Sequence, residues 1–515
     1  MTLDPLRARL GSHAQALGAW ALAPASPRSA RALMALCLAL AALFGRANAR
    51  HDGFLFPIDD AYITLHNAVA LAAGHDPNFA GVSPLVGSTS LAHLLWVRLF
   101  LTAFAPTAAL FAASWVAIAG YAWGLVALAR AHKLSPLLMA LTVVFGVTAA
   151  RTPHHLVNGL ETGLALALFT WVLALGVDDP EAPPSRARPL VWGALVGLMP
   201  FVRPELAVFS AGLVALRLWR RRRPLRREGL FVLAGLALGA APILAWMHHA
   251  TGAWVPATIA AKRVFFAEGC LPAALRHEWS TGASLLMAAT LGYASRGLVL
   301  AAFSPLGRLT VVALGVFIGA YDRLFPGALG HYEQRYWYIF LPALVATLCE
   351  LTQARRRAVA LCAIGLLAVG ADQSLTAAPA RWSEHLANIA FTRDELRPAA
   401  RFVAERLPRD ARVLIHDAGF MSFAASRPMV DFVGLKTPWV PAYHARLTYP
   451  TCGRDRAEAV HQIALEGRVT HLVMLDSWEQ VYRVVEGLRA RGWVVEDLRR
   501  EGRYRVYGLR APTAR

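Results

Sequence analysis

Long apolar runs recur along the first three quarters of this 515-residue chain. They can be delimited at 32–44, 90–105, 107–129, 135–150, 160–177, 189–217, 229–247, 283–304, 308–325, 336–352 and 357–371. About 20 apolar residues in a helix cross the hydrocarbon core of a bilayer. Only helices and closed barrels span lipid, and these runs are too long and apolar for barrel strands. We therefore expect an α-helical polytopic membrane protein of about eleven spans.

The composition excludes other classes of protein. Hydrophobic residues make up 56% of the chain and charged residues 17%, whereas a soluble domain carries about 25% charged residues. A string of soluble domains, a disordered chain and a disulfide-built scaffold are therefore excluded. The formal charge of +19 does not indicate nucleic acid, because arginines gather between apolar runs, as in the block 217–227. Such blocks are typical of cytoplasmic loops.

This rule of basic cytoplasmic loops predicts the topology. The basic N-terminus stays inside, the run Ala32–Phe44 is an uncleaved first span, and the segment 46–89 forms the first external loop. The tail then lies outside. Two points stay open. If every run crossed the membrane once, the basic residues Arg130 and Lys133 would be external, against the rule that basic loops are cytoplasmic. Arg203-Pro204 could also break the run 189–217 into two short helices.

The composition of the sequence changes near residue 380, where charged residues become frequent. Segments 412–416 and 470–475 are predicted to be buried strands, 477–491 has helical periodicity, and 493–498 with 503–509 indicates a hairpin. We expect a transmembrane domain at 1–379 and a soluble α/β domain at 380–515. Cys270 and Cys452 could pair if both face an oxidising compartment, although their spacing does not require it.

Two adjacent carboxylates, Asp59 and Asp60, lie in the first external loop, where Asp59 can cap a predicted helix that begins at Asp60. Acidic residues at a helix N-terminus satisfy free N–H groups and favour the dipole, which explains one aspartate well. Adjacent helical residues point about 100° apart, so the second carboxylate could face a cavity. Capping and catalysis are both open at this point.

An ordered set of short motifs resembles a known family. The motifs are Asp59-Asp60-Ala-Tyr62-Ile, Gly74-His-Asp-Pro-Asn78, Val86-Gly87-Ser88-Thr89-Ser90, Asn158-Gly159-Leu-Glu161-Thr162, Val202-Arg203-Pro204-Glu205, Gly252-Ala-Trp254-Val-Pro256-Ala-Thr258 with Lys262, Arg335-Tyr336, Asp417-Ala-Gly419 and Asp431-Phe-Val-Gly434-Leu435. Together they resemble the GT-C superfamily of polyprenyl-phosphate-dependent glycosyltransferases, especially the bacterial arabinofuranosyltransferases.

The resemblance implies sugar transfer at the outer face of a bacterial inner membrane, with a periplasmic C-terminal domain. It implies Asp60 as base, with Asp59 orienting it or supporting a divalent cation, the only cofactor considered. A general base activates a weakly nucleophilic hydroxyl, and cations hold the departing lipid phosphate. The candidate phosphate holders are Lys262, Arg203 and Arg335, and the candidate supporting residues are Glu161, Tyr62, His66 and Tyr336. An interfacial arginine at 203, a solvated lysine at 262 and a helix-capping glutamate at 161 are the open alternatives.

The implied partners are a polyprenyl-phosphate sugar, such as an arabinofuranosyl donor, membrane lipid, and a periplasmic glycan, lipopolysaccharide or pilin acceptor. No metal-ligand spacing is present among the histidines and cysteines. The alternative is a transporter or flippase for a lipid-linked glycan. Transporters usually contain paired repeats, which we do not find here, and a flippase leaves the external carboxylates without a role.

Overall fold

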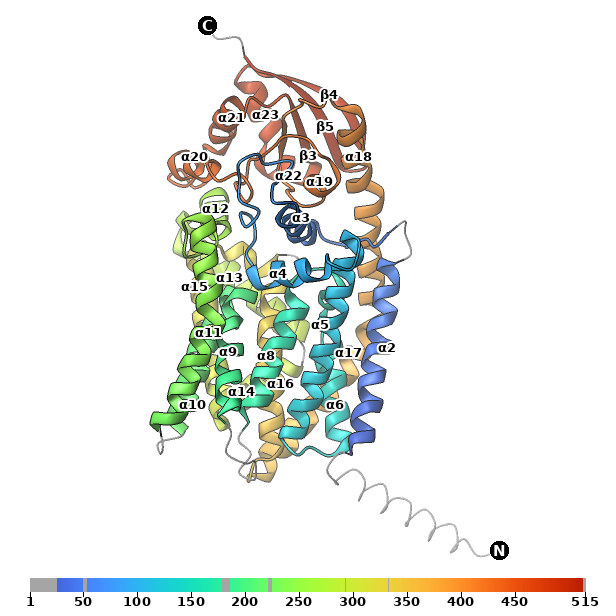
Figure 1. Cartoon of the computed structure of the whole chain (residues 1–515), viewed down its shortest axis with the longest axis vertical. Coiled ribbons are helices and arrows are strands. Elements are labelled where there is room, and N and C mark those ends of the chain that lie inside the picture. The colour runs from blue at the N-terminus through green and yellow to red at the C-terminus, as the bar shows by residue number, and fades with distance from the viewer. Residues whose placement is uncertain are drawn as a thin grey trace, which may run out of the picture.

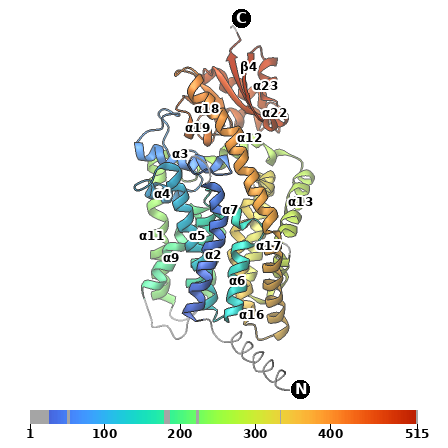
Figure 2. The ribbon, with the colours of Figure 1, turned by 90° about the vertical axis from the view of Figure 1, so that its right-hand side faces the viewer.

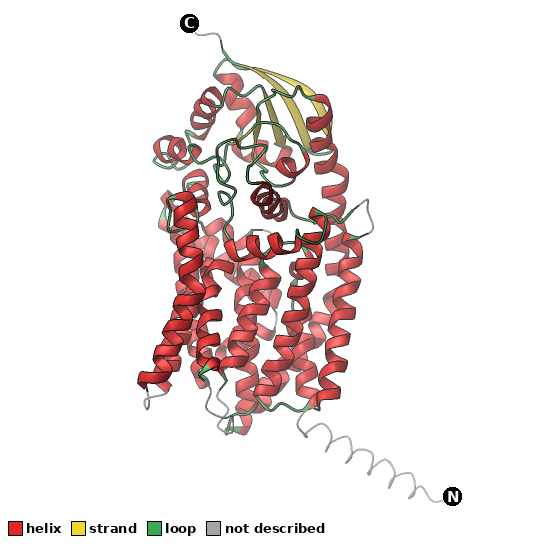
Figure 3. Ribbon diagram, viewed as in Figure 1, coloured by secondary structure: helices red, strands yellow, loops and turns green. Residues whose placement is uncertain are grey.

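The structure is a computed structural model, and it describes residues 26–49, 53–177, 186–220, 225–291, 293–331 and 333–512. A bundle of helices carries a smaller domain at one end, and the sheet lies in that smaller domain (Figures 1 and 3). Five described helical stretches are long and apolar enough to cross a membrane: Pro27–Asn48, Pro106–Ala131, Glu228–Thr251, Pro305–Leu324 and Arg357–Arg406. The protein is therefore a multi-pass membrane protein, and the expected total of about eleven crossings stays a prediction.

The helices of the bundle pack along its length (Figures 1 and 2). They are α2 (Pro27–Asn48), α5 (Pro106–Ala131), α6 (Pro136–Thr148), α8 (Thr162–Gly176), α9 (Ala187–Val202), α10 (Ala207–Arg220), α11 (Leu225–Thr251), α13 (Ala273–Leu291), α14 (Tyr293–Leu300), α15 (Pro305–Leu324), α16 (Leu341–Thr352) and α17 (Arg357–Phe391), with the short α7 (Thr152–Val157). Glycines allow α9 and α11 to approach closely. A methyl group on Gly193 would lie 2.3 Å from the Val232 carbonyl oxygen, and one on Gly235 would lie 2.1 Å from that of Leu190. Small residues at contacts are typical of membrane helices.

Two apolar runs differ from the expectation. The run 90–105 contains only α4 (Leu91–Phe100), whose ten residues are too few to cross a bilayer and which lies across the end of the bundle (Figure 1). The run 189–217 is two helices, α9 and α10. Between them Arg203 is extended (φ −147°, ψ 122°) and Pro204–Leu206 form a 3₁₀ turn. A residue before proline is disfavoured in helical backbone, so Pro204 explains the break.

The position of Arg130 and Lys133 follows from this correction, because without a crossing at 90–105 they change sides. The neighbouring His132 lines a hollow of about 260 Å³ together with Arg217 and Glu350. The basic turn after α5 therefore lies at the same end of the bundle as Arg217. The conflict with the charge rule disappears.

The C-terminal domain contains a five-stranded sheet in the order β2-β1-β3-β5-β4. Its strands are β1 (Val413–Ile415), β2 (Met429–Asp431), β3 (His471–Leu475), β4 (Val494–Glu501) and β5 (Tyr504–Arg510), and its helices are α18 (Arg397–Arg406), α19 (Phe420–Ala424), α20 (Val440–Tyr443), α21 (Arg456–Glu466), α22 (Asp476–Tyr482) and α23 (Val484–Ala490). β1 pairs in parallel with β2 and β3, while β4 and β5 form the antiparallel hairpin. The predicted strands and hairpin are confirmed. The expected helix at 477–491 is divided at Arg483, whose φ is +50°. α17 passes through residue 380 without a break and leads into this domain.

Two short helices lie between the bundle and the C-terminal domain, α3 (Asp59–Ala73) and α12 (Ala257–Phe266) (Figures 1 and 2). α3 begins with the two aspartates and ends at Gly74, whose φ of +78° is the left-handed conformation that glycine favours at helix ends. α12 carries Lys262. The two segments that the sequence marked for chemistry therefore both face the junction of the two parts.

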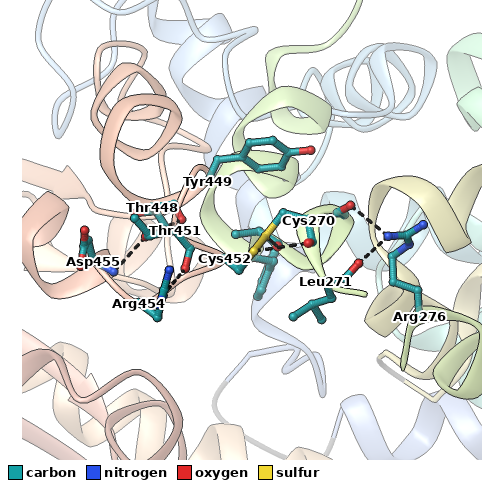
Figure 4. Close-up of a disulfide and its surroundings, with 12 residues drawn as sticks. Cys270, Leu271, Arg276, Thr448, Tyr449, Thr451, Cys452, Arg454 and Asp455 are labelled. Carbon is teal, nitrogen blue, oxygen red and sulfur yellow. Dashed lines mark hydrogen bonds between the residues drawn. A yellow bond between two sulfur atoms is a disulfide. The ribbon is translucent and has the colours of Figure 1, made fainter. Parts of the chain in front are cut away.

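A disulfide joins the segment after α12 to the C-terminal domain. Cys270 and Cys452 are bonded, with Cα atoms 5.6 Å apart and 182 residues between them in sequence (Figure 4). The pairing that the sequence left open is therefore present in the fold. Disulfides form and persist in oxidising compartments.

Candidate active site

A cavity of about 370 Å³ lies beside α12, α15 and the 3₁₀ helix η5 (Arg335–Phe340). Its polar lining residues are Thr89, Glu161, Arg203, Glu205, Thr258, Lys262, Arg263, Tyr321, Arg335 and Tyr336. Apolar residues of α12 and α15 also line it, and three of them, Ile259, Val316 and Leu324, are 42%, 49% and 40% exposed. Exposed apolar side chains on a membrane helix mark a surface that lipid covers. The cavity therefore joins a charged interior to the lipid-facing side.

A second, smaller hollow of about 40 Å³ adjoins this cavity. The two share Thr89, Glu161, Thr258, Lys262 and Arg335 as lining residues. The small hollow adds Asp60, Ile63, Thr64, Gly87, Ser90, Leu160 and Leu435. A carboxylate and several hydroxyl groups thus stand next to the cationic cavity, an arrangement suited to a polar ligand with an anionic group.

Asp60 faces the small hollow from the first turn of α3. Its Oδ2 accepts a hydrogen bond from Nη2 of Arg335 at 2.9 Å, and the carboxylate side chain is 18% exposed. It therefore stays accessible within a site that is otherwise largely buried. The predicted base and a predicted phosphate holder are in direct contact.

Asp59 has the opposite role, although it is the adjacent residue. Its carboxylate oxygens accept backbone N–H groups of Gly419 (3.0 Å) and Phe420 (2.7 Å), at the start of α19 in the C-terminal domain. Burial, followed by the charge of Asp417, raises the pKa of Asp59 well above its usual range, while the two N–H bonds oppose this shift. Gly419 is needed here, because an added methyl group would lie 2.0 Å from the Asp59 carbonyl oxygen. Asp59 docks the C-terminal domain rather than lining either hollow.

Arg203 occupies the break between α9 and α10, where its guanidinium is almost fully buried. It forms ion pairs with Glu161 and, at 3.3 Å, with Glu205, and it lies 4.8 Å from the centre of the Tyr336 ring. Glu161 therefore fixes Arg203 as well as lining the cavity. The extended backbone before Pro204 is what turns this side chain inward.

Besides Arg203, the cationic residues that line the cavity are Lys262, Arg263 and Arg335. Lys262 is half-buried on α12 and lines both hollows. Arg335 donates to the Tyr336 hydroxyl at 3.2 Å as well as to Asp60. The fold thus brings six of the predicted residues together around the two hollows. They come from α3, the start of α8, α12, η5 and the α9–α10 break, and they are Asp60, Glu161, Arg203, Lys262, Arg335 and Tyr336.

Tyr62 and His66 lie on α3 but do not line these hollows. The Tyr62 hydroxyl accepts the Phe56 N–H at 2.9 Å, and its ring packs 4.6 Å from that of Phe420. His66 contacts the Asp76 carboxylate at 3.0 Å. Burial lowers the pKa of His66. Both residues therefore hold α3 in place and do not reach the cavity.

A loop of the C-terminal domain completes the wall of the small hollow. Leu435 lines it, and the next residue, Lys436, is fully buried and donates to Asp76 Oδ2 at 2.8 Å and to the Asn67 side-chain oxygen. Gly87 fits against this loop only without a side chain, since an added methyl group would lie 2.7 Å from Lys436 Cδ. The loop is therefore anchored to the same helix that carries Asp60.

Some lining residues were not identified as site residues from the sequence. Tyr321 donates to Glu205 at 2.5 Å, and the hydroxyls of Thr89 and Thr258 are 2.9 Å apart. Tyr321 stands in an apolar run with no motif around it, so no local signal could have identified it. Across the described residues, no group of three or more His, Cys, Asp or Glu side chains could hold a metal ion.

Comparison with known proteins identifies the fold. ArnT from Cupriavidus metallidurans bound to undecaprenyl phosphate is 12% identical, with a TM-score of 0.56 over 92% of this chain and 97% of ArnT. Its apo form matches with the same identity and coverage and a TM-score of 0.55. An oligosaccharyltransferase from Archaeoglobus fulgidus is 10% identical over 93% of this chain and 73% of its own, with a TM-score of 0.45.

Sequence comparisons match less of the chain. Residues 387–507 match a family model described as a domain of unknown function, DUF8728. No curated protein matches the chain. At 12% identity, the likeness to ArnT concerns the fold, which agrees with the fold predicted from the sequence motifs. The chain is a multi-pass membrane protein with the GT-C fold of ArnT and a small C-terminal sheet domain.

Proposed function

We propose that this protein is an integral-membrane glycosyltransferase that takes a sugar from a polyprenyl-phosphate donor. The observation that carries the proposal is the contact between Asp60 and a cavity containing Arg203, Lys262 and Arg335. The cavity has one charged side and one side toward lipid, as a phosphate carrying a long isoprenoid chain requires. ArnT, which has the same fold, has been solved with undecaprenyl phosphate.

Each residue of the site has a distinct role in the proposed reaction. The acceptor hydroxyl oxygen attacks the anomeric carbon while the bond from that carbon to the phosphate oxygen breaks. The hydroxyl proton passes to the Asp60 carboxylate, as general base catalysis requires. The polyprenyl phosphate leaves with the bonding electrons, and Lys262, Arg203 and Arg335 stabilise the negative charge that it gains. Glu161, Glu205 and Tyr336 hold the two arginines.

The sugar and the side of the membrane belong to the same proposal. The small hollow beside Asp60 suits a compact sugar, and the motif resemblance favours arabinofuranose. The Cys270–Cys452 disulfide supports an oxidising compartment for the C-terminal domain. We infer a bacterial inner-membrane protein whose domain is periplasmic, with a periplasmic glycan, lipopolysaccharide or pilin as acceptor.

The test is transfer by the purified protein in proteoliposomes. Synthetic polyprenyl-phosphoarabinofuranose is supplied with each class of acceptor, and product is measured by mass spectrometry. Glucosyl and mannosyl donors serve as matched controls for the sugar. Formation of a glycosylated acceptor is the expected result. Movement of the donor across the bilayer with no transfer to any acceptor would instead support the flippase.

A further inference from the structure

The C-terminal domain contacts the C-terminal end of α12, the helix that carries Lys262. Arg456 of α21 donates from Nε and Nη2 to the Phe265 carbonyl oxygen at 3.1 and 3.0 Å, and from Nη2 to that of Phe266 at 3.1 Å. Phe265 and Phe266 are the last residues of α12. The last carbonyl groups of a helix have no partner within the helix, and here an arginine from 190 residues away satisfies two of them.

Aromatic packing reinforces the same contact. Phe265 is fully buried, and its ring lies 5.3 Å from Tyr482 and 5.9 Å from Trp478 of the C-terminal domain. The Arg456 guanidinium lies 5.1 Å from the centre of the Phe265 ring and 4.7 Å from that of Tyr482. A guanidinium over an aromatic face gains from the ring quadrupole. Arg456 thus bonds the backbone and covers the ring at the same point.

The disulfide holds the chain just beyond this contact. Cys270 follows α12 by four residues and is bonded to Cys452, which precedes Arg456 by four residues (Figure 4). Arg263 of α12 also donates to the Tyr449 hydroxyl at 3.3 Å. The C-terminal half of α12 is therefore held by one region of the C-terminal domain, and on the bundle side Phe266 stacks on Phe325 with ring centres 4.5 Å apart.

Lys262 lies close to this contact along the helix. It lies three and four residues before Phe265 and Phe266, which is one helical turn. In the described part of the chain, no hydrogen bond or ion pair joins the Lys262 ammonium to another residue. Arg203 and Arg335, in contrast, are each held by carboxylates.

We propose that Arg456 is a positioning residue for Lys262, and that the C-terminal domain thereby sets the affinity of the site for the lipid phosphate. The proposal rests on the proposed function only in taking a polyprenyl phosphate as the ligand. When Arg456 is lost, α12 frays at its C-terminus and the ammonium is no longer held over the phosphate. Loss of Arg456 leaves the contacts that hold α3, and with it Asp60, unchanged.

Binding of undecaprenyl phosphate to the purified protein tests this directly, without any transfer step. We expect Lys262→Met to weaken binding about ten- to a hundredfold, as loss of a charge-assisted hydrogen bond does. Arg456→Met should weaken it about three- to tenfold, within the range of couplings inside one network. Arg456→Lys keeps the positive charge and N–H donors on a single nitrogen, so it should recover part of the loss. The matched control is Arg446→Met, which removes an arginine that bonds Gln462 and lies over Tyr443 within the same domain.

The double variant separates positioning from general destabilisation. If Arg456 acts through Lys262, Arg456→Met in the Lys262→Met background changes binding less than twofold. A full three- to tenfold loss in that background would overturn the proposal, as would unchanged binding by Arg456→Met alone. Should Arg456→Met fail to fold, Arg456→Lys and Cys452→Ser carry the same cycle with Lys262→Met. Binding with these couplings but no sugar transfer would uphold the inference and reject the proposed function.

Discussion

Replacing Asp60 by asparagine tests the proposed base most directly. Asparagine has the same size and its amide oxygen can still accept the Arg335 hydrogen bond of 2.9 Å, so the shape of the site is retained. What is lost is the ability to take the acceptor proton. A positioned general base contributes about 10²- to 10⁴-fold, or about 3–5 kcal/mol of the barrier. We expect kcat to fall by that factor, with the donor KM unchanged or lower because a negative charge near the phosphate is removed.

The neighbouring Asp59 supplies the matched control for this experiment. Asp59→Asn replaces one of the two oxygens that accept the Gly419 and Phe420 N–H groups by an amide donor. An N–H left without its acceptor costs about 1–3 kcal/mol, so docking of the C-terminal domain should weaken. The readouts are single-turnover kinetics and the unfolding midpoint. Asp60→Asn that transfers sugar at the wild-type rate, or an Asp59→Asn that loses kcat to the same degree without loss of stability, would refute the division of roles.

Three further outcomes are expected from the structure. Leu435→Ala enlarges the hollow beside Asp60, so the kcat/KM ratio for hexosyl over pentosyl donors should rise about tenfold, measured by competition between the two. Lys436→Met leaves the buried Asp76 carboxylate without this cation and should cost about 3–5 kcal/mol in unfolding free energy. Lys133→Met, in the exposed turn after α5, should change it by less than about 0.5 kcal/mol. Reduction of Cys270–Cys452 should lower the unfolding midpoint, and Cys452→Ser should show that lower midpoint with or without dithiothreitol.

Periodicity and charge in the sequence predicted the bundle, and strand patterns predicted the sheet, because both signals are local. The exceptions have local causes that compete with hydropathy. The run 90–105 is apolar enough to span but contains a helix of only ten residues, since Ser90 caps its start and Pro106 begins the next helix. Pro204 divides another run because the residue before it is pushed out of helical backbone.

The site was partly predictable for a similar reason. Asp60, Lys262 and Arg335 stand in short motifs, so their residue types and neighbours indicated chemistry. The separation of Asp59 from Asp60 could not be predicted, because it depends on the two N–H groups of Gly419 and Phe420, 360 residues later. Tertiary contacts of this range leave no pattern in either segment alone.

The burial of Lys436 restricts how an acceptor can arrive. To lift the C-terminal domain off α3, the membrane protein would have to separate this ammonium from Asp76, release Asp59 from Gly419, and do so against a covalent bond on the α12 side. A hinged cover that opens in every turnover is therefore a poor description of the domain. We expect the domain to stay docked, so that the acceptor of the proposed reaction reaches Asp60 from the side, between the domain and the helical bundle.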